Sequence, residues 1–127
     1  MSFSSFAAVG LGAALGAWLR WGLGVLLNPL FLTLPLGTLA ANLVGGYLVG
    51  VAVTVFHINV DLPPEFKLFV ITGFLGGLTT FSTFSAEVVS LIQRAEYGWA
   101  AGTASLHLCG SLLLTGLGIY TVLQLAK

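Results

Sequence analysis

The stretch that decides the fold is FKLFVITGFLGGLTTFSTFSAEVVSLIQR, residues 66–94, with an apolar first half and a centre rich in glycine, serine and threonine. As one continuous helix it would measure about 43 Å, which exceeds the roughly 30 Å hydrocarbon core of a bilayer. Glycine disfavours helix, and Ser and Thr side chains compete for backbone hydrogen bonds. We therefore expect a membrane helix that breaks near Gly76–Thr80.

The composition of the whole chain supports a membrane location. Of 127 residues, 57% are hydrophobic and only 6% are charged, against roughly a quarter in soluble domains. Mean hydropathy is +1.06. This excludes a water-soluble fold, a disordered chain and a basic surface for nucleic acid. The single cysteine, Cys109, excludes an internal disulfide.

The uncharged stretches and the prolines divide the chain into four helices. Asn28-Pro29, Pro35 and Pro63-Pro64 mark the loops between apolar runs. We expect an all-α integral membrane protein, a single domain over 1–127 with transmembrane helices at roughly 4–27, 36–56, 66–94 and 98–125. The N-terminal run lacks a basic start and continues past the length of a signal peptide, so we expect it to be the first membrane helix.

The basic residues are balanced across the expected membrane. Lys67 and Lys127 lie on one side, and Arg20 and Arg94 on the other. The positive-inside rule then gives no preferred orientation, which predicts insertion both ways round and an antiparallel dimer. The alternative is that so few charges carry no information and another feature orients the chain.

Three glycine pairs have the spacing that allows close helix contacts: Gly12/Gly16, Gly46/Gly50 and Gly73/Gly77. They are compatible with an oligomer, but packing within one chain would explain most of them.

A break in mid-membrane is tolerated only inside protein or beside a water-filled cavity, and such breaks build ion sites. The alternative is a helix that merely kinks. Phe81 and Phe84 lie three apart, on one face, among hydroxyls. Aromatic rings have positive edges that can face an anion, although such pairs more often pack in a core or against lipid.

Other polar residues interrupt the apolar helices. Asn42, one turn after Thr38, can donate to an anion or join two helices. A stripe at four-residue spacing favours a wet track, or else a hydrogen-bonded helix interface; its members are Thr103, His107, Ser111 and Thr115.

Arg20 and Glu87 are the charges that intrude furthest into apolar segments, so each needs pairing or a wet vestibule. Arg20 could attract anions at an entrance, or extend to the headgroups beside Trp18 and Trp21. No constellation of catalytic or metal-ligating residues is visible, so we expect no enzyme.

Residues 73–87, GFLGGLTTFSTFSAE, closely resemble the signature of the Fluc (CrcB-type) fluoride channels. The stretch PLGTLAAN, residues 35–42, resembles their second helix, and Arg20 within WLRW looks like their helix 1 arginine. The resemblance covers nearly the whole chain.

This resemblance implies a dual-topology homodimer with two fluoride pores in the inner (plasma) membrane. It implies that Phe81 and Phe84 line the pores and that Asn42 donates a hydrogen bond to fluoride. A structural sodium ion at the dimer centre would be held by the carbonyls of Gly76 and Thr79. The remaining pathway candidates, some of them matched loosely, are Ser82, Thr83, Thr38, Ser111, Thr115 and His107.

Two other classes compete with a fluoride channel. A small multidrug-type exporter also has four helices, but it needs a membrane carboxylate, and the first helix here has none. A non-transporting scaffold subunit would explain the glycines but not the run of hydroxyls and phenylalanines.

Overall fold

A computed structural model describes residues 1–127, and every regular element in it is helical. Four helical runs are long and apolar enough to cross a membrane, and they cover Phe3–Leu30, Leu36–Ile58, Pro64–Gln93 and Tyr97–Leu125. This confirms the prediction of an all-α chain with four candidate membrane spans.

The four runs are α1 (Phe3–Leu27) followed by the single turn η1 (Asn28–Leu30), then α2 (Leu36–Ile58), a composite third run, and α6 (Tyr97–Leu125). The third run consists of α3 (Pro64–Lys67), η2 (Leu68–Leu75), α4 (Gly76–Leu78) and α5 (Phe81–Gln93).

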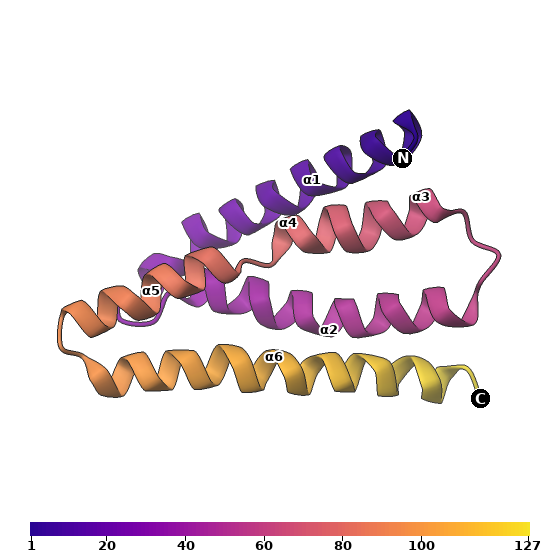
Figure 1. Cartoon of the computed structure of the whole chain (residues 1–127). Helices are drawn as coiled ribbons and strands as arrows, with labels where there is room; N and C mark the ends of the chain where they lie inside the picture. Colours follow the sequence, from indigo (N-terminus) through magenta and orange to yellow (C-terminus); the bar gives the residue numbers. More distant parts are fainter.

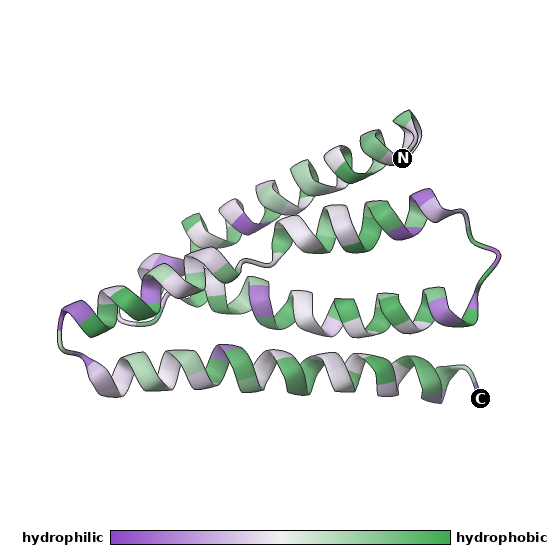
Figure 2. Cartoon of the chain, in the orientation of Figure 1, coloured by the Kyte–Doolittle hydropathy of each residue, from purple (hydrophilic) through white to green (hydrophobic).

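Successive runs are antiparallel, and both chain termini lie at one end of the bundle (Figure 1). The loop between α2 and α3 is at that same end, and the other two loops are at the opposite end (Figure 1). Hydrophilic residues gather mainly at the two ends, and the lengths of the helices between them are largely hydrophobic (Figure 2). This is the distribution that a bilayer requires of a spanning bundle.

The third run changes its hydrogen bonding along its length. Residues Leu68–Leu75 form a π-helix, a rare geometry that is frequent at functional sites. The helix stops after Leu78: Thr79 and Thr80 are extended, and α5 begins at Phe81. The non-helical backbone is therefore restricted to two threonines, while Gly76 and Gly77 stay helical.

Close packing against α1 explains why position 77 is a glycine. A methyl group there would lie 2.6 Å from the Ala13 carbonyl oxygen of α1. The pairs Gly12/Gly16 and Gly73/Gly77 face each other across the contact between α1 and the third run. Gly46 and Gly50 approach α6 in the same way. All three glycine pairs therefore contact other helices of the same chain, so their spacing is explained without an oligomer.

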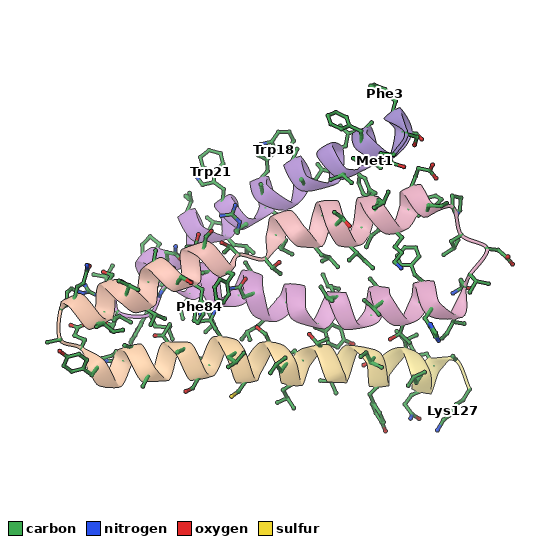
Figure 3. All side chains as sticks on the ribbon, viewed as in Figure 1. Met1, Phe3, Trp18, Trp21, Phe84 and Lys127 are labelled. Carbon is green, nitrogen blue, oxygen red and sulfur yellow. The ribbon has the colours of Figure 1, made fainter.

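The interior of the single chain is small and its outer faces are apolar. Leu75 and Leu78 are buried beside Ala41 of α2. Trp18 and Trp21 point away from the bundle (Figure 3). Large exposed apolar side chains are present on all four spans, which suits contact with lipid.

Candidate ion pathway

The break between α4 and α5 is held by Asn42. Its Oδ1 accepts from the Thr80 backbone N–H at 2.7 Å, and its Nδ2 donates to the Thr80 carbonyl at 3.0 Å. The Asn42 amide thus pairs with an extended residue much as a neighbouring strand would. Buried backbone groups need such partners, and Thr80 is itself buried. Thr80 Oγ1 also caps α5 by accepting from the Thr83 N–H at 3.1 Å.

A cavity of about 280 Å³ lies beside this break, between α2, α5 and α6. None of its lining residues is charged. Six of the residues that the sequence singled out line it: Asn42, Thr79, Phe81, Phe84, His107 and Ser111. The cavity therefore offers amide, hydroxyl, imidazole and aromatic groups to an occupant, without a fixed charge.

The aromatic rings form a short stack along one side of this cavity. Phe81 and Phe84 meet edge to face, with ring centroids 5.6 Å apart. The Phe84 ring lies 4.7 Å from the His107 ring, at an interplanar angle of 32°. Figure 3 shows Phe84 on the side of α5 that faces the rest of the bundle. Phe81, in contrast, is 79% exposed in the single chain.

Arg20, Thr38 and Thr83 line a second pocket of about 270 Å³, which also touches Thr80. The Arg20 Nε donates to the Gly77 carbonyl at 3.0 Å, close to the end of α4. Arg20 forms no ion pair, because the only salt bridge in the chain joins Arg94 to Glu96. Its guanidinium therefore leaves positive charge beside this pocket.

Glu87 lies at a third pocket, of about 320 Å³, with Thr83 and Arg94. The Thr38 hydroxyl donates to its Oε2 at 2.7 Å, while its Oε1 is buried without a partner. The two intruding charges are thus held by different elements and do not pair with each other.

The other predicted residues lie outside the first cavity. Thr115 donates to the Gly46 carbonyl at 2.8 Å, so its hydroxyl hydrogen is used within the bundle. Ser82 is exposed, and its Oγ lies 3.3 Å from Thr80 Oγ1. Gly76 is also exposed, and a methyl group there would contact only the Ile71 carbonyl, at 3.6 Å.

Sequence reasoning did not single out Thr80 or Asn28. Thr80 carries only a weak signal, since threonine is a preferred N-cap residue, but position 83 is threonine and not the Glu or Gln of a capping box. Asn28 was read only as part of a helix-breaking dipeptide. Its Oδ1 accepts from the N–H groups of Gly37 and Thr38, at 2.7 and 3.2 Å, and so caps α2.

Comparison with known proteins gives a consistent match. The family model described as CrcB-like protein, Camphor Resistance (CrcB), matches residues 7–119. A protein of Nitrosospira multiformis named Fluoride-specific ion channel FluC is 63% identical over 127 residues, covering 100% of this chain and 99% of the relative. A protein of the same name from Dechloromonas aromatica is 64% identical over 122 residues, covering 96% and 90%. Another, from Pseudomonas putida, is 60% identical over 117 residues, covering 92% of each. The chain belongs to the CrcB-like protein family, a family of ion channels and not of enzymes.

Proposed function

We propose that this protein is a fluoride-selective ion channel that passively exports cytoplasmic fluoride across the inner (plasma) membrane. The observation that carries the proposal is the uncharged cavity beside the helix break, lined by Asn42, Ser111, His107 and the two phenylalanines. The names of the relatives, at 60% identity and more, support fluoride as the ion.

The chemistry of the lining suits fluoride. Fluoride is small and strongly hydrated, so a pathway must replace its water shell with hydrogen-bond donors and positive ring edges. Conduction also requires that the ion leave each site, and neutral donors bind less tightly than a fixed cation. Chloride is larger, so a narrow path with matched donors rejects it. An interior-negative potential drives the anion out with about 2.3 kcal/mol per charge per 100 mV.

The functional unit in this proposal is an antiparallel homodimer with two pores. The balanced Lys and Arg residues support insertion in both orientations. Phe81 is 79% exposed at the rim of the cavity. A second copy covering Phe81 would close that rim and place both phenylalanines inside a pore.

A structural sodium ion at the dimer centre completes the proposal. Thr79 is extended, and its carbonyl accepts no hydrogen bond from the chain. Carbonyl oxygens of unwound backbone are suitable sodium ligands. Gly76 is exposed close by, so a partner could approach it. The carbonyls of Gly76 and Thr79 from each subunit would hold the ion, and the ion would join the two breaks.

Anion efflux from proteoliposomes tests the function. Liposomes are loaded with potassium fluoride or potassium chloride, and valinomycin is added so that K⁺ can leave and balance the charge of the anion. An ion-selective electrode follows the release of fluoride or chloride. We expect fast fluoride release and no chloride release. A well-folded protein that releases no fluoride would remove the channel proposal and reopen the exporter and scaffold alternatives.

A further inference from the structure

Gly45 of α2 is a glycine that its backbone conformation does not require. It lies inside an α-helix, and no glycine in the chain has a positive φ. Glycine also lowers helix stability relative to alanine. The space around position 45 supplies the reason for the glycine. Gly45 is buried, and a methyl group there would overlap the side-chain methyl group of Thr79.

The Thr79 side chain is held at two points. Its Oγ1 donates to the Leu75 carbonyl at 2.8 Å, and its methyl group occupies the space that Gly45 leaves open on α2. Both groups are attached to Cβ, so a rotation about χ1 that moved the methyl group away from α2 would also break the hydroxyl bond. The side chain therefore has one orientation that satisfies both contacts.

These two contacts fix the residue at which the third run leaves helical geometry. The Thr79 N–H still closes the last helical turn on the Leu75 carbonyl, at 3.0 Å. In contrast, the Thr79 ψ of 152° turns its own carbonyl out of the helical direction. Anchoring the side chain at both its hydroxyl and its methyl group restricts Cα, and with it the direction of this carbonyl.

One turn of α2 supports both extended residues of the break. Asn42 pairs with the backbone of Thr80. Gly45, three residues later and on nearly the same face of α2, accommodates Thr79. The next glycine, Gly46, approaches α6 instead. The break is therefore held against α2 by an amide at one residue and by the absence of a side chain opposite the other.

We propose that Gly45 is a positioning residue for the cation site: it accommodates the methyl group of Thr79 and so directs the Thr79 carbonyl toward the sodium ion at the dimer centre. This inference rests on the sodium site of the proposed function and deepens it. Gly45 has no side chain that could touch the ion, so its effect on sodium passes through Thr79. The residue pair is matched, because serine at position 79 would lack the methyl group and alanine at position 45 would displace it.

The sodium dependence of thermal unfolding is the first test. The full chain, purified in detergent without sodium, is unfolded in sodium chloride and in N-methylglucamine chloride at equal ionic strength. Sodium should stabilise the wild type, because it binds the folded protein only. Gly45→Ala should require about 10-fold more sodium or more for half of that stabilisation, the usual effect of removing the support of a metal ligand. Thr79→Ser, which loses one of two anchors, should show a smaller shift in the same direction.

A second substitution should rescue Gly45→Ala in a way that a general packing defect would not show. Thr79→Ser keeps the hydroxyl that bonds to Leu75 but removes the methyl group that an alanine at position 45 would overlap. The double variant Gly45→Ala/Thr79→Ser should therefore recover the sodium response of Thr79→Ser alone. Its fluoride efflux from proteoliposomes should also exceed that of Gly45→Ala.

Gly50→Ala is the matched control on the same helix. A methyl group at position 50 would overlap the Thr115 carbonyl oxygen of α6, so this variant also disturbs packing, but away from the break. We expect a lower unfolding temperature, an unchanged sodium dependence and no rescue by Thr79→Ser. If Gly45→Ala does not fold, Thr79→Ser must restore folding in the double variant, and a wild-type sodium response of Thr79→Ser alone would overturn the inference.

The inference and the proposed function fail separately in these experiments. If sodium stabilises the wild type and a folded Gly45→Ala responds at the same concentrations, the role of Gly45 is overturned and the sodium site stands. Failure of Thr79→Ser to rescue the double variant overturns that role as well. If sodium does not stabilise the wild type, the sodium site is rejected together with the inference, while fluoride efflux by the wild type still decides whether the protein is a channel.

Discussion

At the scale of single residues, the proposed pathway depends on ring edges that only aromatic side chains provide. Phe81 and Phe84 meet edge to face beside the uncharged cavity. Phe81→Ile and Phe84→Ile keep apolar bulk but remove the positive edge. We expect each to lower fluoride efflux at least about 10-fold, the equivalent of about 1.4 kcal/mol. Leu113→Ala on the exposed face of α6 is the control. Normal conduction by both isoleucine variants would refute the ring-edge mechanism.

The Thr38 hydroxyl is the only group that satisfies the partly buried carboxyl of Glu87. Thr38→Val has nearly the same shape but removes this donor, which leaves both carboxyl oxygens without a partner. The free energy of unfolding should fall by about 1–3 kcal/mol. Thr38→Ser, which keeps the hydroxyl, should lose much less. Chemical denaturation in detergent micelles measures the difference, and equal losses in the two variants would contradict the role assigned to this bond.

Residue types and helical faces were predictable from the sequence, but hydrogen-bond partners were not. The four-residue stripe on α6 divides between its two interpretations: His107 and Ser111 line the cavity, whereas the Thr115 hydroxyl bonds to Gly46 of α2. The sequence allows two interpretations of Asn42, an anion donor or a link between helices, and slightly favours the link. The pairing of Asn42 with Thr80, 38 positions away, requires that Thr79 and Thr80 be extended. No local sequence pattern predicts this long-range contact.

At the scale of helices, the glycine stripes set how closely the spans approach. A methyl group on Gly16 would overlap the Phe74 carbonyl oxygen and lie 2.8 Å from Leu78 N, so backbone must move. We expect Gly16→Ala to lower the free energy of unfolding by about 1–3 kcal/mol or more. Gly10 on the same helix has nothing within 4 Å. Gly10→Ala should be neutral or slightly stabilising. Thermal unfolding of Gly16→Ala and Gly10→Ala therefore distinguishes the effect of helix packing on stability from the effect of helix propensity.

The start of α2 depends on a side chain from the end of α1. Pro35 supplies no side-chain cap, and the Asn28 Oδ1 accepts from Gly37 and Thr38 instead. Asn28→Ala should cost about 0.5–2 kcal/mol of stability, the usual value of a lost N-cap. Asn28→Asp keeps the accepting oxygen and adds charge that a helix N-terminus favours, so it should retain most of the stability. Chemical denaturation tests this, and an alanine variant as stable as the wild type would remove the capping role.

The bounds of the long helices follow from prolines and apolar runs, so the sequence predicted them closely. The position of the interruption did not follow as directly. The adjacent glycines, Gly76 and Gly77, have the lowest local helix propensity, yet both are helical, and Gly77 packs against Ala13 of α1. Within the predicted range Gly76–Thr80, the helix is interrupted only at Thr79 and Thr80, and Asn42 supplies backbone partners for Thr80. Tertiary contacts thus decide which of the helix-breaking residues actually break the helix.

At the scale of the whole molecule, two basic residues against two predict both orientations in the membrane. A reporter fused to the C-terminus should therefore be found on both sides. Gln124→Arg adds a positive charge at the end with the termini, and Gln93→Arg adds one at the opposite end; both positions are exposed. Each variant should shift the population toward one orientation, in opposite directions.

An antiparallel dimer makes conduction depend on both orientations being present. Either variant alone should therefore give less fluoride efflux per molecule, because few opposite partners remain. Co-expression of Gln93→Arg with Gln124→Arg supplies complementary orientations and should restore the flux. Gln93→Glu and Gln124→Glu are the matched controls, since acidic residues contribute little to membrane orientation. A wild-type reporter found on one side only, with full conduction by each arginine variant alone, would rule out dual topology.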